Sequence, residues 1–461
     1  MSPLRRVEAD YLVVGAGAMG MAFTDALVDH ADVRVALVDR RHAVGGHWLA
    51  AYPFVQLHQS SSFYGVASTV LGGARVQTRG PEAGLHERAG QPAILAYYAD
   101  VLTDRLVGSG RVEFFPGCSY VGDSTFVSRV SGERYVVPEG CRVVDARYLA
   151  PDIPAELPPR FDVAEGARVV PLNELVHLEE APRQYVVVGS GKTATDAIVW
   201  LLGRGVDPDG VCWVRPREPW MLNRALIQPE PVVYLGMVAA MLDAAASAAS
   251  LDALFLALEE AGIMLRIDRS VTPTMAKAPT LGAWELELLR SVTHVVRLGH
   301  VRSVARGRLE LEHGSVEIAP DALVVNCAAD GLKNPPLVPI WQPSSITLQP
   351  VRAGFPCFGA AVTGYVEATR RDSGDGVKNA LCGPSSYGNS LADWARMNVL
   401  GMRNAASLAA EPDLADWVNR VALNPARVPP EHPASPELDA VRERVRDRSG
   451  PGLARLSELM V

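Results

Sequence analysis

The sequence has few cysteines and no close pair of them. Its six cysteines, at positions 118, 141, 212, 327, 357 and 382 of 461 residues, are far apart, and there is no C-x-x-C motif. This spacing indicates neither a disulfide framework nor a structural zinc site. His42 and His47 are five positions apart but have no other ligand-type residue near them, so we expect no bound metal.

The sequence also lacks a long hydrophobic run and an excess of positive charge. Its longest apolar stretch outside the glycine motifs, 232–242, is too short to span a bilayer. A net charge of −8 provides no general basic face for nucleic acid. Arg5 and Arg6 precede an apolar run as in a secretory signal, but Asp10 interrupts that run. We therefore expect a soluble, cytoplasmic protein of two or three domains, without nucleic-acid or membrane partners.

The sequence contains two copies of a strand, glycine turn and helix pattern. In the first, the apolar run 11–14 leads into G-x-G-x-x-G at 15–20, and the next strand, 33–38, ends on an acid. The glycines allow a tight turn and close approach of a pyrophosphate, the helix start offers N–H groups, and the acid suits a ribose hydroxyl. This copy is predicted to bind FAD. Its candidate residues are Gly15, Gly17, Ala18, Met19, Gly20, Asp39 and Arg40.

The second copy begins with the apolar run 185–188 and continues as G-x-G-x-x-A at 189–194. Its GSGKT sequence resembles a nucleoside triphosphate loop, but Val186 stands where that loop needs a glycine. The following strand ends on Arg215, where an arginine suits the 2′-phosphate of NADPH, although a solvated surface charge is the alternative. Lys192 either contacts a cofactor phosphate or points to solvent. The candidate NADP residues are Gly189, Ser190, Gly191, Lys192, Thr193, Arg215 and Arg217.

These patterns predict an α/β protein with two Rossmann-like dinucleotide-binding domains, the NADP domain being inserted into a discontinuous FAD domain. Proline-rich stretches at 151–159 and 335–349 mark the connections. The expected boundaries are 1–160 and 302–425 for the FAD domain, 161–301 for the NADP domain with a helical insertion at about 225–290, and 426–461 for a C-terminal helical tail.

Four further segments resemble the class B flavoprotein monooxygenases, which include flavin-containing and Baeyer-Villiger monooxygenases. Residues 45–48 are similar to the family's G-G-x-W, 52–64 to its Y-P-x-x-x-x-D-x-x-S-x-x-Y, 321–331 to its return strand and 390–395 to its T-Q-A-R-W-A. The resemblance implies that these segments approach the flavin. It adds Gly46, His47, Trp48, Tyr64, Ser390 and Leu391 to the cofactor-binding candidates.

The resemblance implies that NADPH reduces FAD, and that a C4a-peroxyflavin then transfers one oxygen from O2 to a small-molecule substrate. His58 and Ser61 are the catalytic candidates, as hydrogen-bonding groups around that intermediate. The unperturbed pKa of histidine also allows proton delivery near neutral pH, whereas the alternative for His58 is a packed loop residue.

Several departures from the family limit this expectation. His58 replaces the family's aspartate, and neither the F-x-G-x-x-x-H-x-x-x-W-P signature nor the supporting arginine is found, which favours N- or S-oxygenation or hydroxylation over Baeyer-Villiger insertion. The alternatives are an FAD and NADPH oxidoreductase that does not oxygenate and, more remotely, a non-catalytic NADPH sensor. A disulfide reductase is not indicated because 45–65 contains no cysteine. We expect 220–289 to shape the substrate pocket.

Overall fold

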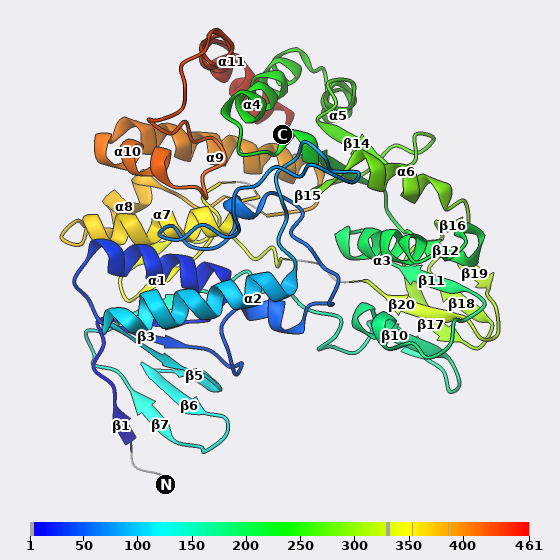
Figure 1. Ribbon diagram of the computed structural model, residues 1–461, viewed down its shortest axis with the longest axis horizontal. Helices are drawn as coiled ribbons and strands as arrows, with labels where there is room; N and C mark the ends of the chain where they lie inside the picture. The colour runs from blue at the N-terminus through cyan, green and yellow to red at the C-terminus, as the bar shows by residue number, and fades with distance from the viewer. Residues whose placement is uncertain (1–3, 329–331, 353, 386, 461) are drawn as a thin grey trace.

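The computed structural model describes residues 4–328, 332–352, 354–385 and 387–460. Two α/β lobes lie side by side, and a helical cap lies across them (Figure 1). The first lobe is built on a sheet of order β21-β22-β8-β2-β3-β4, in which only β21 runs antiparallel to its neighbour. These strands are β2 (Tyr11–Val14), β3 (Val35–Val38), β4 (Val112–Phe115), β8 (Arg142–Asp145), β21 (Trp341–Gln342) and β22 (Ser345–Thr347).

Both faces of this first sheet are buried, which explains why β2 and β3 are apolar at every position. Val13 and Leu37 face a core formed with the helices, whereas Leu12 and Val38 face a core formed with a second, smaller sheet. The helices are α1 (Ala18–His30), α2 (Gln91–Asp100), α7 (Pro356–Thr369) and α8 (Asp375–Leu381); the smaller sheet contains β1 (Leu4–Arg6), β5 (Cys118–Gly122), β6 (Thr125–Ser128) and β7 (Arg134–Val136).

The second lobe contains a parallel sheet of order β10-β20-β11-β12-β16. Helices α3 (Lys192–Gly203) and α6 (Ala283–Ser291) contribute to the core on one face, and a meander of three antiparallel strands, to which β9 adds in parallel, contributes to the core on the other. The sheet strands are β10 (Arg168–Pro171), β11 (Tyr185–Val188), β12 (Val211–Val214), β16 (Val295–Val296) and β20 (Leu323–Asn326); the sheet of the meander contains β9 (Asp162–Val163), β17 (Val301–Ala305), β18 (Arg308–Leu311) and β19 (Gly314–Glu317).

The fold class predicted from the sequence is confirmed, but the predicted return to the first lobe at residue 302 is wrong. Strand β20 pairs in parallel with both β10 and β11, so the chain leaves the second sheet only after Asn326. It rejoins the first sheet at β21. The apolar pattern of 322–326 correctly indicated a strand, but such a pattern does not tell which sheet a strand joins.

The cap combines the insertion with the C-terminal part of the chain, as one hydrophobic core rather than as an appendage of the second lobe. The expected helical insertion also contains a small sheet, β14-β13-β15. The cap elements are β13 (Pro219–Asn223), α4 (Pro231–Ser247), α5 (Leu251–Glu260), β14 (Met264–Arg266), β15 (Met275–Leu281), α9 (Leu391–Ala410) and α11 (Pro436–Leu459), and α10 (Pro412–Arg420) follows α9 on the first lobe.

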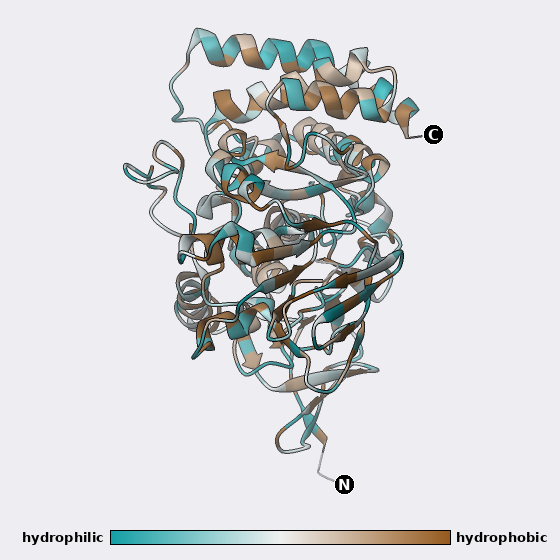
Figure 2. Ribbon diagram, turned by 90° about the vertical axis from the view of Figure 1, so that its right-hand side faces the viewer, coloured by the Kyte–Doolittle hydropathy of each residue, from teal (hydrophilic) through white to brown (hydrophobic). Residues whose placement is uncertain are grey.

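The C-terminal tail is helical, as predicted, and α11 packs along α4. A side chain at Gly452 would place its Cβ 2.8 Å from a Leu242 methyl group, so this glycine allows the two helices to approach closely. Arg444 and Arg448 form ion pairs with Asp243 on α4. Figure 2 shows the pair at the top of the molecule, with α11 the more hydrophilic of the two helices.

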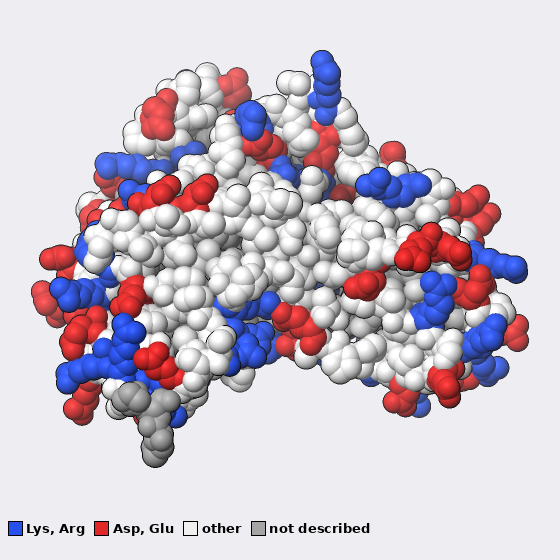
Figure 3. All heavy atoms as spheres, turned by 60° about the horizontal axis from the view of Figure 1, so that its bottom comes forward, with Lys and Arg blue, Asp and Glu red and all other residues white. Residues whose placement is uncertain are grey.

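The surface gives further information about partners. On the face shown in Figure 3, basic and acidic side chains are interspersed around both lobes, and the middle of the face is mostly uncharged. Within the described ranges, no helix is both long and apolar enough to cross a bilayer. In the same part of the chain, no group of three His, Cys, Asp or Glu side chains is placed to hold a metal ion.

Candidate active site

The first glycine turn connects β2 to α1 in the conformation that its sequence requires. Gly15 has a φ of +109°, and a Cβ at Gly20 would overlap the Gly15 carbonyl oxygen, so both positions need glycine. Asp39, at the end of β3, accepts hydrogen bonds from the backbone N–H of Ala16 (2.7 Å) and of Arg41 (2.8 Å). The acid predicted to contact a ribose therefore also fixes the turn from which α1 begins.

The G-G-x-W segment lies directly against this turn. The N–H of Gly45 donates to the Ala16 carbonyl at 2.9 Å, and a Cβ at Gly46 would lie 2.9 Å from the Gly17 Cα. Trp48, in a short 3-10 helix over Gly46–Ala50, donates from Nε1 to the Tyr64 hydroxyl at 2.5 Å. The structure thus joins the predicted flavin-side residues of two segments to the first turn.

Two other flavin-side candidates, Ser61 and Ser390, have roles in local structure, and a third, His47, has a shifted pKa. Ser61 donates to the Glu87 carbonyl at 3.1 Å and accepts from the Ala89 N–H at 2.8 Å, so its hydroxyl fixes the loop. Ser390 is the N-cap of α9 and accepts from the N–H of Asp393, so its hydroxyl fixes the start of this helix at Leu391. Burial, together with Arg41, lowers the pKa of His47 to about 4.

The second glycine turn has the space and the polar atoms that a dinucleotide phosphate requires. A Cβ at Gly189 would lie 2.8 Å from the Cys327 carbonyl oxygen, so the turn packs tightly against the end of β20. A Cβ at Gly191 would meet nothing within 4 Å. The buried Ser190 hydroxyl has no hydrogen-bond partner in the described structure. An open glycine and an orphaned hydroxyl at a helix start fit a bound phosphate.

The two cationic candidates near this turn do not point freely to solvent. Lys192 forms ion pairs with Asp196 and, at 3.2 Å, with Glu285. Arg215 is 1% exposed, and its guanidinium lies 4.3 Å from the centre of the Trp213 ring. It forms an ion pair with Glu218 at 2.8 Å, while its Nη1 has no hydrogen-bond partner in the described structure.

Arg215 is therefore not a solvated surface charge, and its role toward a 2′-phosphate stays a prediction. Replacing it with alanine should weaken NADPH binding about ten- to a hundredfold more than NADH binding, since a charge-assisted hydrogen bond is worth about 1.5 to 3 kcal/mol. Titrations of both nucleotides would measure this selectivity. Equal losses for both would show that Arg215 only stabilises the lobe. Arg183, an exposed arginine of the same lobe outside the candidate site, is the matched control, and its replacement should leave the selectivity unchanged.

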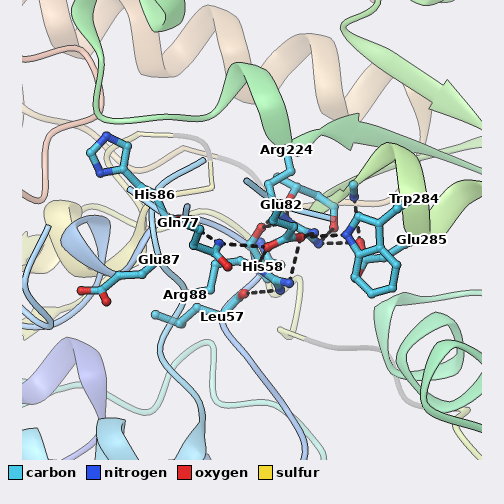
Figure 4. Close-up of polar contacts among 12 residues, drawn as sticks. Leu57, His58, Gln77, Glu82, His86, Glu87, Arg88, Arg224, Trp284 and Glu285 are labelled. Carbon is cyan, nitrogen blue, oxygen red and sulfur yellow. Dashed lines mark hydrogen bonds and ion pairs between the residues drawn. The ribbon is translucent and has the colours of Figure 1, made fainter. Parts of the chain in front are cut away.

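A cluster of charged side chains joins the two lobes close to the second turn; Figure 4 shows its central part. We call it the interlobe charge cluster. Its members are Glu82 and Arg88 from the first lobe and Lys192, Asp196, Arg224 and Glu285 from the insertion and second lobe. Three carboxylates balance three cations, and their side chains are between 1% and 15% exposed.

Arg224 is the centre of the interlobe charge cluster. Its guanidinium pairs with Glu82 on one side and with Glu285, at 2.6 Å, on the other. Burial alone would raise the pKa of Glu285, but Lys192 and Arg224 lower it to about 2. Glu285 is therefore ionised over the whole physiological pH range. This is expected of buried charges, which are tolerated only in pairs.

His58 lies next to this cluster but is neutral. Its carbonyl oxygen accepts hydrogen bonds from Arg224 Nε (3.0 Å) and from the Thr280 hydroxyl. Its ring Nδ1 is buried and has no partner in the described structure. Burial, and then the positive charges of Lys192 and Arg224, lowers the pKa of His58 to about 3. His58 thus does not change charge near neutral pH, in contrast to the proton-delivery role expected from its unperturbed pKa.

An apolar cavity begins on the other side of Thr280. Its empty volume, counted together with the part that opens to solvent, is about 560 Å³. Most of its lining comes from 220–289, the region expected to shape a substrate pocket, and the rest comes from the first lobe and α9. The lining residues are Gln59, Leu222, Ile227, Tyr234, Met237, Met241, Ile263, Ala278, Thr280, Gly354, Phe355, Trp394, Met397 and Asn398.

Sequence reasoning did not find the interlobe charge cluster. Glu82, Arg224 and Glu285 belong to no glycine motif. Arg224 is 142 positions from Glu82 and 61 positions from Glu285, and it forms hydrogen bonds with both. The available signal was weak: Arg224 is the one charged residue of the mostly apolar stretch 219–227, and Glu285 lies in a helix with other charged residues. Arg224 nevertheless lies beside the flavin-side loop, because its Nε donates to the His58 carbonyl oxygen.

Comparisons with known proteins identify relatives of the whole chain and of its first turn. Residues 13–51 match the family described as NAD(P)-binding Rossmann-like domain, which confirms the dinucleotide turn predicted there. A protein of Mycobacterium tuberculosis, "Uncharacterized protein Rv2000", is 42% identical over 425 residues, covering 92% of this chain and 78% of its own. A protein of Mycobacterium bovis, "Uncharacterized protein Mb2023", matches to the same extent.

Solved structures resemble the chain more distantly. Cyclohexanone monooxygenase from Rhodococcus sp. Phi1 bound to NADP+ has a TM-score of 0.48 and 14% identity, covering 96% of this chain and 97% of that one. Bacillithiol disulfide reductase from Bacillus cereus has a TM-score of 0.47 and 13% identity, covering 79% of this chain and all of that one.

Proposed function

The chain belongs to the same protein family as the mycobacterial protein Rv2000, and from this premise we propose that it is an FAD- and NADPH-dependent oxidoreductase. More specifically, we propose a monooxygenase that transfers one oxygen atom from O2 to a small-molecule substrate and reduces the other to water. N- or S-oxygenation or hydroxylation is favoured over Baeyer-Villiger insertion for two reasons. His58 replaces the aspartate of the class B monooxygenase motif, and the Baeyer-Villiger signature is missing from the sequence.

The proposal depends above all on the position of the apolar cavity. Gln59, in its wall, follows His58 directly, and His58 lies in the segment that resembles the flavin-side motif. Thr280, also in its wall, donates to the His58 carbonyl. The cavity is therefore separated from the interlobe charge cluster by one layer of side chains, at the place where both cofactors are expected to meet. Substrate pockets of oxidoreductases lie at such domain junctions.

The residues of the two glycine turns suit the binding of FAD and NADP, respectively. The α1 start at 17–20 would hold the FAD pyrophosphate, with Asp39 at the ribose, and the α3 start at 190–193 would hold the NADP phosphates. When bound, the cofactors supply hydride transfer and the activation of O2. The apolar walls of the cavity exclude water, which protects a reactive oxygen donor from unproductive decay.

The test is to reduce the FAD-loaded protein with NADPH without oxygen, admit air, and record absorbance spectra. Once a substrate is known, we expect one O2 and one NADPH to be consumed for each oxygenated product. The alternative, an oxidoreductase that does not oxygenate, predicts substrate turnover without oxygen incorporation from labelled O2. A protein that purifies colourless and cannot be loaded with FAD would contradict both.

Replacing His58 with alanine should change coupling more than flavin reduction. Its neutral ring and its place beside the cavity suit packing and hydrogen bonding rather than proton transfer. NADPH oxidation should remain within several-fold of the wild-type rate, and more hydrogen peroxide should be released, because water enters a less packed site. Measuring NADPH consumed, peroxide released and product formed checks this. Equal losses of reduction and oxygenation would show instead that His58 supports FAD binding or the fold.

A further inference from the structure

Two polar side chains in the wall of the apolar cavity have no hydrogen-bond partner. Gln59 is 5% exposed and Tyr234 is 7% exposed, and both line the cavity. Neither the Gln59 carboxamide nor the Tyr234 hydroxyl forms a hydrogen bond within the described part of the chain. Both groups line the cavity without a protein partner, so a ligand in the cavity is the group placed to hydrogen-bond with them.

The other polar residues of the wall differ because protein groups already use them. Thr280 donates to the His58 carbonyl and accepts from Arg224. Asn398 donates to the Trp394 carbonyl one turn earlier in α9. The hydrogen-bonding capacity left for a ligand therefore belongs mainly to Gln59 and Tyr234.

The remainder of the wall determines what kind of molecule these two groups would hold. It consists mostly of aliphatic, methionine and aromatic side chains, such as Leu222, Met237, Met241, Phe355 and Trp394. None of the described lining residues carries a charge. An ionised ligand would lose its hydration without gaining a counter-ion, which is strongly unfavourable.

We propose that the cavity binds a neutral, largely apolar molecule carrying a hydrogen-bonding group such as a hydroxyl or carbonyl, and that Gln59 and Tyr234 determine this specificity by anchoring that group. The inference rests on the proposed function, because it takes the cavity to be the substrate site. Gln59 comes from the loop that follows β3, whereas Tyr234 is on α4 of the cap. A bound molecule therefore bridges the first lobe and the cap.

The test is equilibrium dialysis of the FAD-loaded protein with three naphthalene probes of similar shape. They are 1-(2-naphthyl)ethanol, which can donate and accept, 2-ethylnaphthalene, which can do neither, and 2-naphthoate, which is charged. We expect the alcohol to bind about five- to thirtyfold more tightly than the hydrocarbon, from one or two added hydrogen bonds. Naphthoate should bind least. Absence of binding by every probe, or tightest binding by naphthoate, would overturn the proposal.

Two variants test the anchors. Tyr234→Phe and Gln59→Leu preserve most of the side-chain volume, so each should reduce the preference for the alcohol over the hydrocarbon, and together they should abolish it. Hydrocarbon binding should remain within about threefold, since the apolar walls are unchanged. Gln56→Leu, at an exposed position of the same loop, is the matched control and should retain the full preference. A preference that persists in the double variant would refute the assignment.

The dialysis experiment needs neither NADPH nor O2, so its outcome is separate from that of the proposed function. Selective binding of the alcohol without any oxygenation would leave the ligand class intact and contradict the monooxygenase. Oxygenation of a charged substrate, with no preference among the neutral probes, would contradict the ligand class and leave the monooxygenase intact.

Discussion

Replacing Arg224 with methionine should lower the free energy of unfolding by about 3 kcal/mol, at the lower end of the range for breaking a buried ion pair. Arg224 is 1% exposed and lies between Glu82 and Glu285. Methionine fills similar space but leaves each carboxylate with one cation fewer. Glu82 keeps Arg88 and Glu285 keeps Lys192, so neither becomes fully unpaired. Urea denaturation followed by circular dichroism measures the loss.

The free energy of unfolding measured at acidic pH provides a second test of the interlobe charge cluster. Because the folded-state pKa of Glu285, about 2, lies below its usual value of 4.5, its contribution to stability is complete above about pH 4.5 and is lost as the pH falls toward 2. In the Arg224→Met protein this pKa should rise, so the folded protein should lose less stability from Glu285 on acidification. Arg308→Met, which removes an exposed pair with Glu310, is the control and should leave stability essentially unchanged. Equal effects of the two substitutions would contradict a stabilising role for the cluster.

Replacing Gly17 with valine should yield protein with little or no FAD. The side chain would project where the first turn must approach a pyrophosphate, and we expect affinity to fall by at least about tenfold, a change of roughly 1.4 kcal/mol. A Cβ at Gly17 would lie 3.4 Å from the Gly46 Cα, an ordinary contact that larger branches would tighten. The ratio of flavin to protein absorbance after purification, and after incubation with added FAD, measures the effect.

Gly140→Val is the matched control for this substitution. Gly140 is exposed, and a Cβ there would meet nothing within 4 Å, so FAD content should equal that of the wild type. The far-ultraviolet circular dichroism spectrum of the Gly17→Val protein should show a folded chain, because the loss concerns the ligand. If that folded protein retained its full complement of FAD, the first turn would not be the flavin site.

The sequence predicted local features well, because glycine turns and apolar strands are determined by neighbouring residues. Gly15 and Gly189 have positive φ angles, as the tight turns after β2 and β11 require. The helix start at Leu391 also follows from local chemistry, since Ser390 and Asp393 form a capping box. The G-G-x-W segment, which follows the first unit in the sequence, lies against the first turn.

The same reasoning was less successful wherever a residue's role depends on a distant partner. Arg215 follows a strand as predicted, but its burial over Trp213 and its pairing with Glu218 depend on how the second lobe packs. The sheet to which β20 belongs is similarly not encoded in 322–326 alone, because an apolar strand suits any buried sheet position.

By itself, the sequence determined that this protein has two dinucleotide-binding units, with the candidate FAD turn at 15–20 and the candidate NADP turn at 189–194. Only the tertiary structure brought Arg224 beside Glu82, lowered the pKa of His58 to about 3, and placed Gln59 and Tyr234 in one cavity. The physical reason is that backbone turns depend on a few adjacent residues. Burial, ion pairing and desolvation depend on side chains that approach each other only after the lobes and the cap have packed together.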